Sequence, residues 1–329
     1  MEVYMRLGKL DNDTLERLIL SKFKKRRPEV LSMPGIGEDC AAVDLGSNLA
    51  VLSMDPITSA AKDLGRLSVY INCNDAASAG AEPVGIMVTL LIPPGASEDD
   101  ISNFANQLCE AADHANVDIL GGHTEVTDSV ARMITCTAVL AKVPKNGLIL
   151  PSGMREGDDI IMTKWAGMEG TAVIASDFSH LAELERDELE FAAAFKEQIS
   201  AVREGLEAAG HGAHAMHDVT EGGVLGAAWE LAYASGCGIE LDLASVPVHP
   251  VTEKICLKLG LDPYRLLSSG CMLIACKDGE NMVRVLNDCG VKAQIIGKAC
   301  GKGVRLKNGP AVEPPQADEI YKLFGSGSV

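Results

Sequence analysis

Apolar residues recur along the chain in two spacings, one typical of amphipathic helices and one typical of buried strands. In the first half, the helical spacing predicts helices over 12–24, 62–80 and 98–116. Short apolar runs predict strands over 49–54, 84–91, 117–120 and 132–141. The second half continues the mixture, with strands expected near 158–163, 214–219, 270–276 and 291–297 and helices near 168–176, 183–209, 224–234 and 279–288. This alternation predicts a fold of the α/β (α+β) class.

The chain has 329 residues, which suits two domains better than one core. Pro151-Ser152-Gly153 interrupts the pattern near the middle, so we predict domains at 1–150 and 151–329. Aromatic residues make up only 4% of a chain that is 47% hydrophobic. That balance favours helices and strands that pack through aliphatic faces.

The net charge of −17 is unfavourable for contact with nucleic acid or with anionic membranes, and we expect neither partner. A nucleotide remains compatible with this charge if carboxylate-held Mg²⁺ mediates the contact. No apolar run reaches the length of a membrane span, and the first residues do not form an apolar signal core. These features predict a cytoplasmic protein. The ten cysteines include no Cys-x-x-Cys pair, which favours small buried thiols over disulfides or a metal site.

Carboxylates lie at the ends of predicted strands or inside an adjoining helix. They are Glu38-Asp39, Asp55, Asn74-Asp75 and Glu125. Mg²⁺ prefers oxygen ligands and takes one or two carboxylates per ion, so acids on separate elements could hold several ions along a triphosphate. Each acid alone could equally cap a helix or face solvent.

Two glycine pairs, Gly121-Gly122 and Gly222-Gly223, offer main-chain amides that could approach a phosphate. Either pair could also be a simple turn. The Walker and dinucleotide-binding motifs are missing from the sequence. His211, His214 and His217 recur every three residues, but no fourth ligand is near in sequence, which favours structural or exposed histidines over zinc.

Four motifs in order resemble those of the aminoimidazole ribonucleotide synthase superfamily. They are Gly37–Val43 (GEDCAAV), Asn74-Asp75 with Gly80–Pro83 (GAEP), Gly121–Glu125 (GGHTE) and His217–Gly223 (HDVTEGG). Each is similar to segments of the hydrogenase-maturation carbamoyl dehydratase, of thiamine monophosphate kinase or of related branches. Each motif alone is weak, whereas their order and spacing are specific. The resemblance is closest to the hydrogenase-maturation branch and spans about Gly8 to Gly297.

The resemblance implies a two-domain fold in which the N-terminal mixed sheets of two subunits pair into a barrel-like homodimer. The C-terminal α/β sandwich would close the active-site cleft, and ATP would lie against the N-terminal domain, partly across the dimer. Asp39, Asp55 and Asp75 would hold Mg²⁺, with Asn74 and Glu125 near the phosphates. Gly121, Gly122, His123 and Thr124 would line the nucleotide, and Asp218, Thr220, Gly222 and Gly223 would face the γ-phosphate or the acceptor. Asp75, Asp218 and Glu125 are the candidate catalytic residues.

The family chemistry uses ATP to phosphorylate a poorly reactive oxygen of a small or protein-borne acceptor. Two departures bear on the reaction. The carbamoyl dehydratase carries its substrate on a C-terminal cysteine, whereas the last cysteine here is Cys300. His123 stands where the kinase has an acid. An ATP-dependent phosphoryl-transfer or dehydration enzyme is therefore expected first, a non-catalytic ATP-binding maturation partner second and a thiamine monophosphate-type kinase third.

Overall fold

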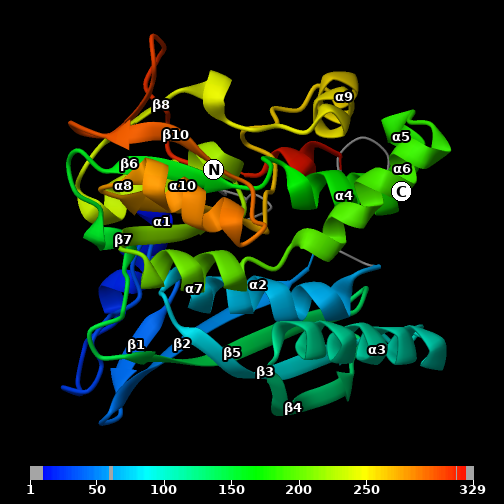
Figure 1. Ribbon diagram of the computed structural model, residues 1–329. Coiled ribbons are helices and arrows are strands. Elements are labelled where there is room, and N and C mark those ends of the chain that lie inside the picture. The colour runs from blue at the N-terminus through cyan, green and yellow to red at the C-terminus, as the bar shows by residue number, and fades with distance from the viewer. Residues whose placement is uncertain (1–9, 59–61, 316, 324–329) are drawn as a thin grey trace, which may run out of the picture.

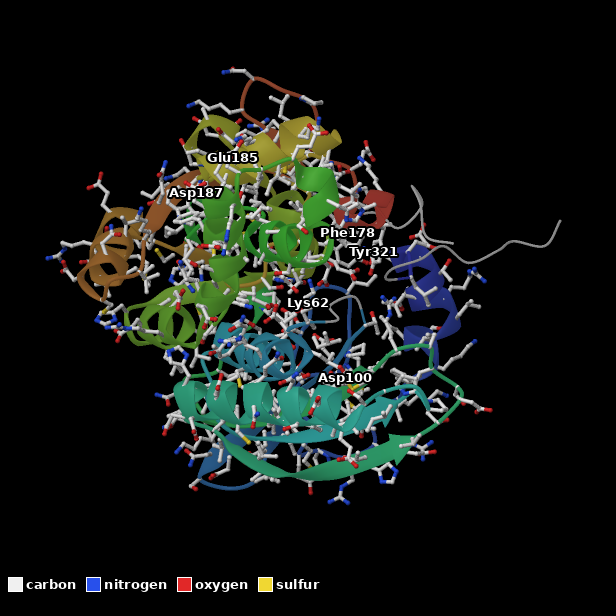
Figure 2. The ribbon with its side chains drawn as sticks, turned by 90° about the vertical axis from the view of Figure 1, so that its right-hand side faces the viewer. Lys62, Asp100, Phe178, Glu185, Asp187 and Tyr321 are labelled. Carbon is white, nitrogen blue, oxygen red and sulfur yellow. The ribbon has the colours of Figure 1, made fainter. Side chains whose placement is uncertain are left out.

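The computed structural model describes residues 10–58, 62–315 and 317–323, and it places them in two layers stacked one above the other (Figure 1). The lower, N-terminal layer comprises β1 (Ala41–Asp44), β2 (Asn48–Ile57), α2 (Leu64–Ser78), β3 (Glu82–Ile92), α3 (Glu98–Ala115), β4 (Asp118–Val126) and β5 (Ile134–Pro144). Helix α1 (Asn12–Leu18) lies at the side of the molecule, at the level where the layers meet (Figure 2). The strands of the C-terminal layer are β6 (Asp159–Thr163), β7 (Ala213–Val219), β8 (Ile239–Leu241), β9 (Cys271–Cys276), β10 (Ala293–Ala299) and β11 (Val304–Leu306). Its helices are α4 (Met168–Asp177), α5 (Ser179–Ala182), α6 (Arg186–Ala193), α7 (Val202–Gly210), α8 (Gly223–Ser235), α9 (Pro250–Leu259) and α10 (Gly279–Asp288).

The N-terminal sheet is mixed, with the strand order β1-β2-β5-β3-β4. All pairs are antiparallel except β3 and β4, which are parallel and are joined by α3 as the crossover. Helix α3 begins with a capping box between Ser97 and Asp100 and ends at Asn116 in the left-handed conformation. Figure 1 shows α2 and α3 above this sheet and no helix of the described chain below it.

Helix α2 lies at the centre of the molecule, between the N-terminal sheet and α7 (Figure 1). All of its residues except Arg66 are buried, including Ser68, Asn72, Asn74 and Asp75. A helix that is buried on all sides needs no polar face, so these polar side chains must find partners inside the protein. Ser68 satisfies this rule by bonding to Thr135 on β5 at 2.7 Å between the two hydroxyl oxygens.

The C-terminal sheet has the strand order β11-β8-β10-β6-β9-β7 and carries helices on both faces. Alternate residues of β6 separate into two cores: Ile160 and Met162 join the cluster that contains α4, α8 and α9, whereas Ile161 joins the cluster that contains α7 and α10. On the lower side, α7 approaches α2 closely. A side chain at Gly205 would come within 2.4 Å of the Ala77 carbonyl oxygen, which explains the glycine there.

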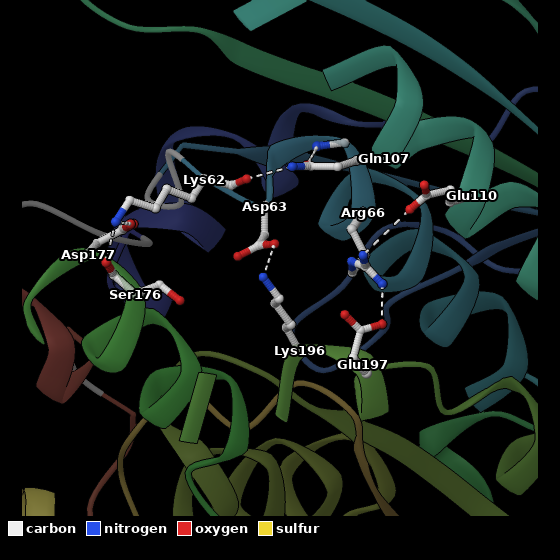
Figure 3. A network of polar contacts seen from close by, with 10 residues as sticks. Lys62, Asp63, Arg66, Gln107, Glu110, Ser176, Asp177, Lys196 and Glu197 are labelled. Atoms are coloured by element: carbon white, nitrogen blue, oxygen red, sulfur yellow. Dashed lines mark hydrogen bonds and ion pairs between the residues drawn. The ribbon is translucent and has the colours of Figure 1, made fainter. Parts of the chain in front are cut away.

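Ion pairs and hydrogen bonds join the two layers around the N-terminus of α2 (Figure 3). The Asp63 carboxylate pairs with Lys196 at 3.0 Å, and Arg66 pairs with Glu197. Lys62 donates to the carbonyl oxygen of Ser176. Figure 2 shows Lys62 at the level where the layers meet. Of the helices in the described ranges, none is both long and apolar enough to cross a membrane.

Most predicted elements are present, but three predictions were wrong in detail. The helix expected over 12–24 ends at Leu18 and continues only as the short 3₁₀ turn Leu20–Lys22. The strand expected to end before Asp55 runs on to Ile57, so Asp55 lies within β2. The strand expected over 117–120 runs on to Val126, so Gly121–Glu125 is part of β4. The helices expected over 183–209 are confirmed as α6, the 3₁₀ turn Ala194–Gln198 and α7.

Candidate active site

Four aspartates from four separate elements face one another between the two layers. They are Asp39 in the loop before β1, Asp55 on β2, Asp75 on α2 and Asp218 on β7. Burial raises the pKa of the Asp75 carboxyl well above its ordinary value, and the charges of Asp218, Asp55 and Asp39 raise it further. The structure therefore brings the carboxylates that were predicted for Mg²⁺, together with Asp218, within electrostatic reach of one another.

Strand β2 and helix α2 position the centre of this cluster. Ser53 and Asp55 alternate with exposed residues along β2 and so lie on the face that α2 covers. The Ser53 hydroxyl donates to Asp75 Oδ2 at 2.6 Å, and the Asp55 backbone amide donates to Asn72 Oδ1 at 2.9 Å. The buried Cys40 thiol donates to the Asp75 carbonyl oxygen, and burial raises its pKa well above the ordinary value, in keeping with a packing role.

Asn74 connects the two layers. Its amide nitrogen donates to the Ile199 carbonyl oxygen at 2.9 Å, and its amide oxygen accepts from the Ala201 backbone amide at 2.6 Å. The side chain is completely buried. Because both ends of the amide are engaged by the segment that leads into α7, Asn74 fixes the position of the neighbouring Asp75 relative to the C-terminal layer.

The imidazole of His217 supplies a positive charge next to the carboxylates. Burial opposes its charge, but Asp39, Glu230 and Asp218 outweigh that effect and raise the pKa of the imidazole to about 9. Nδ1 lies 2.6 Å from the Asp218 carbonyl oxygen and 3.6 Å from Asp39 Oδ2, while Nε2 lies 3.4 Å from Glu230 Oε2. With a proton on each nitrogen, His217 acts as a counterion to the carboxylates.

The donor set fits a divalent cation that prefers oxygen. Asp39, His217 and Asp218 each offer one ligand atom, and these atoms lie within 4.8 Å of one another. Two of these three ligand atoms are aspartate oxygens, and Asp55 and Asp75 lie within electrostatic reach, so the site is rich in the oxygen ligands that Mg²⁺ prefers. Next to them, Glu38 has a buried Oε2 without a hydrogen bond among the described residues, and burial followed by the charge of Asp39 raises its pKa. A cation would relieve this accumulation of buried negative charge.

The backbone amides of the glycine pair at the start of α8 form hydrogen bonds within the protein. Gly222 has φ +83° and its amide donates to Asp318 Oδ2 at 2.8 Å. A side chain at Gly223 would come within 2.6 Å of the Tyr264 carbonyl oxygen, which restricts this position to glycine. The Gly223 amide donates to the Thr220 carbonyl oxygen. In this structure the amide that was expected to face a phosphate therefore binds a carboxylate of the C-terminal segment.

Asp318 belongs to a second buried acidic group in the C-terminal layer. Burial raises the pKa of Asp318 to about 6 and that of Glu169, at the start of α4, to about 7. Ser269 lowers the pKa of Glu169, whereas Asp318 and Glu221 raise it. Glu169 is 4% exposed and lines a narrow pocket between the layers together with Asp63 and Lys196.

The segment Gly121–Glu125, predicted for the nucleotide site, is found on β4. It lies apart from the four aspartates of the same chain. Asp55 and Gly122 occupy one lateral row of the sheet, three strands apart, at roughly 14 Å by the usual strand spacing. His123 and Glu125 pair in register with Thr89 and Leu91, which point away from the helix-covered face. His123 Nε2 and Glu125 Oε2 are 3.4 Å apart, and every residue of β4 is exposed.

Sequence reasoning assigned no role to His217, Glu230 or Ser53. His217 was quoted within a motif, but its partners come from a loop about 180 residues earlier and from α8. His211 and His214 lie elsewhere, His214 beside Asp158 at 2.9 Å and His211 beside Glu207. The three-residue spacing is therefore not a shared site.

The two halves of the chain match the two domains of one protein family. Residues 37–142 match the N-terminal domain, and residues 155–307 the C-terminal domain, of AIR synthase related proteins. The chain belongs to this family, which confirms the predicted superfamily and fold class.

Two curated relatives align along most of the chain. A putative hydrogenase expression/formation protein of Methanocaldococcus jannaschii is 30% identical over 309 residues, 89% of this chain and 88% of that protein. The carbamoyl dehydratase HypE of Escherichia coli K12 is 27% identical over 311 residues, 89% of each chain. Among solved structures, AaThiL complexed with AMPPCP and TMP has a TM-score of 0.77 at 20% identity and covers 96% of this chain and 99% of that one. This last likeness supports the fold.

Proposed function

We propose that the protein is an ATP- and Mg²⁺-dependent enzyme of hydrogenase maturation that activates an oxygen of a small or protein-borne acceptor. The reaction is phosphoryl transfer, or dehydration in which phosphate then leaves. Support comes from the name of the E. coli relative, a carbamoyl dehydratase, and from that of the M. jannaschii relative, a hydrogenase expression/formation protein. The structural neighbour with AMPPCP adds that a nucleotide analogue fits this fold.

The observation that carries the proposal is the buried carboxylate cluster around Asp75. Burial and like charges raise its pKa strongly, and such an arrangement is costly unless a cation or a reaction uses it. Mg²⁺ bound there would neutralise phosphate charge and hold the phosphate oxygens in position. Asp39, Asp55 and Asp75 are the proposed metal ligands.

Asp218 and the turn after it are proposed to face the transferred phosphate and the acceptor. The Asp218 carboxylate lies beside the buried, protonated His217 ring. The positive charge of this ring stabilises the negative charges of Asp218 and Asp39. Thr220, Gly222 and Gly223 continue from Asp218 into α8, and a phosphate at this turn would have to replace the Asp318 carboxylate at the Gly222 amide. In this arrangement the chain supplies orientation and electrostatics, and the covalent chemistry takes place between ATP and the acceptor.

We propose further that residues 1–150 bind the nucleotide and form a homodimer, while residues 151–329 close over the site. The uncovered face and free edge of the N-terminal sheet expose apolar side chains on all four of its longer strands. They include Leu52, Met54, Val84, Met87, Ile119, Leu120, Val126 and Leu140. Exposed apolar patches of this kind mark interfaces. Pairing of two such sheets would bring the residues Gly121 to Glu125 of one subunit toward the nucleotide site of the other.

The proposal is tested by following ADP and free phosphate in parallel with wild type, Asp75→Asn and the control Asp288→Asn on the exposed end of α10. The acceptors are a peptide ending in S-carbamoylcysteine and thiamine monophosphate. Dehydration releases one phosphate per ADP, whereas a kinase releases ADP and retains the phosphate on its product. We expect ADP release that requires Mg²⁺ and falls at least about 100-fold in Asp75→Asn.

Wild-type turnover in Asp75→Asn would contradict the proposed role of the cluster. Mg-ATP binding without ADP release, whichever acceptor is present, would instead favour a non-catalytic nucleotide-binding partner.

A further inference from the structure

A second cavity lies in the C-terminal layer, away from the four aspartates. It is bounded by the end of β6, by α6 and the 3₁₀ turn after it, by the start of α9 and by the turn before β10. Its volume is about 340 Å³, which is within the range of small-molecule sites. None of the residues predicted for the nucleotide or the metal lines it.

The walls of the cavity are aromatic. The His249 ring meets Trp165 edge-on at 5.3 Å between centroids and Phe195 edge-on at 5.3 Å. Phe191 stacks on His249 at 5.0 Å and an interplanar angle of 30°. Phe191 is nevertheless 50% exposed, so a large apolar ring borders the cavity and also meets solvent. Flat rings arranged in this way suit a flat ligand.

One polar group of the cavity is the imidazole of His249. The His249 Nδ1 accepts the Val251 backbone N–H at 3.2 Å, so the ring carries its proton on Nε2. Burial and the charge of Lys292 lower the pKa of His249, which keeps the ring neutral at pH 7. His249 therefore offers one N–H donor and no charge.

Lys292 provides the net charge of the cavity. Its ammonium nitrogen lies 4.5 Å from the centroid of the Trp165 ring, and no carboxylate of the described residues forms an ion pair with it. The other lysine of the cavity, Lys164, is neutralised by Glu204 at 2.6 Å. In a chain of net charge −17, an aromatic cavity with an unneutralised lysine is an unusual local environment.

We infer that this cavity binds a small planar aromatic anion, with its ring among Trp165, Phe191 and His249 and its negative group at Lys292. Stacking against the aromatic side chains would supply the affinity, and the Lys292 ammonium group would favour an anionic ligand over a neutral one. The cavity also shares a backbone segment with the acidic site. Lys164 donates to the carbonyl oxygens of Gln198 and Ser200, and Asn74 binds the residues on either side of Ser200.

The two tryptophans of the chain, Trp165 and Trp229, make the test direct. The full-length protein is labelled with 5-fluorotryptophan and titrated with naphthalene-2-sulfonate as the anionic probe and with 2-naphthalenemethanol as the neutral probe. Fluorine NMR follows one resonance per tryptophan, and Trp229→Phe assigns them. The variants are Lys292→Gln and the exposed Phe191→Ala, with Lys302→Gln on an exposed turn as the charge-matched control.

We expect a saturable shift of the Trp165 resonance with the sulfonate, no shift of the Trp229 resonance and binding of the alcohol at least about 5-fold weaker. Lys292→Gln should remove the preference for the anion, Phe191→Ala should weaken both probes, and Lys302→Gln should change neither. An unchanged Trp165 resonance would overturn the inference. So would equal affinity for the two probes, or sulfonate binding that survives both cavity variants. The readout requires no ATP turnover, so it stands or falls separately from the proposed enzyme activity.

Discussion

Helix α2 and strand β4 belong to the same sheet-and-helix layer but have opposite environments. Helix α2 is polar for a core element, yet all of its residues except Arg66 are buried. Strand β4 carries Ile119, Leu120 and Val126, yet every one of its residues is exposed. Within a mostly apolar core, α2 therefore buries a group of polar side chains, whereas β4 leaves apolar side chains exposed.

Each of these two environments has a cost in stability or solubility that other contacts must offset. Burying Asn72, Asn74 and Asp75 costs stability unless each group is paired, and the structure pairs them with β2 and with the segment before α7. Leaving apolar strands uncovered costs solubility unless another surface covers them. By our proposal, the first arrangement serves a cation site, and the second serves a subunit interface.

The largest expected effect is on the outer face. Met87→Asp introduces a charge where Met87 is 54% exposed in the single chain and, by our proposal, buried in the dimer. Twofold symmetry buries this charge twice, so we expect dimerisation to weaken by about 5 kcal/mol. Sedimentation velocity measures the change. Leu257→Asp on α9, where the side chain is 87% exposed, is the matched control, and equal effects of the two variants would refute the interface.

The next effect is on the inside of the layer. Asn74→Ala removes both hydrogen bonds to the segment 199–201 and leaves a buried carbonyl and a buried amide without partners. We expect the free energy of unfolding to fall by about 3 to 4 kcal/mol. Urea denaturation of the variant and of Asn103→Ala, on the exposed side of α3, provides the comparison. A loss below about 1 kcal/mol would show that Asn74 does not hold the layers together.

Some of the elements and site residues of the two regions could be predicted from the sequence, and others could not. The capped, strongly periodic helices α3 and α10 were predicted almost to the residue, because local signals define them. Strand β4 was predicted to end at residue 120 because two glycines usually interrupt a strand, whereas here Gly121 and Gly122 continue the edge strand with φ values of +145° and +149°. The position of Asp75 inside a helix was predicted. Its engagement with Ser53, and the charge of His217, depend on tertiary contacts that no local pattern reports.

Glu169 predicts a pH dependence of stability in the C-terminal layer. Its folded-state pKa, about 7, is above the ordinary value of 4.5. The protonated form is therefore favoured by folding, and its stabilisation is complete below about pH 4.5 and is lost as the pH rises through 7. Relative to wild type, Glu169→Gln should gain about 3 kcal/mol between pH 4.5 and 8. Denaturant titrations at several pH values test this, with the exposed Glu280→Gln as control, and parallel pH profiles of wild type and Glu169→Gln would exclude a raised pKa.

The smallest effect concerns the ion pairs that join the layers in Figure 3. Lys196→Met breaks the pair with Asp63, in which the lysine side chain is 31% exposed. Partly exposed pairs contribute little, so we expect a loss of less than about 1 kcal/mol in the free energy of unfolding. Thermal unfolding at low and high salt measures it. A loss as large as that of Asn74→Ala would mean that the network, and not the buried amide, holds the layers in register.

The central claim is that the aspartates around Asp75 hold Mg-ATP. The most direct test is calorimetric titration of Mg-ATP into wild type, Asp75→Asn and Asp288→Asn, with unfolding curves to confirm that each variant is folded. The account predicts binding by wild type and Asp288→Asn, and affinity at least about 50-fold weaker in a folded Asp75→Asn, because a metal ligand is lost. Equal affinity of wild type and Asp75→Asn would contradict it.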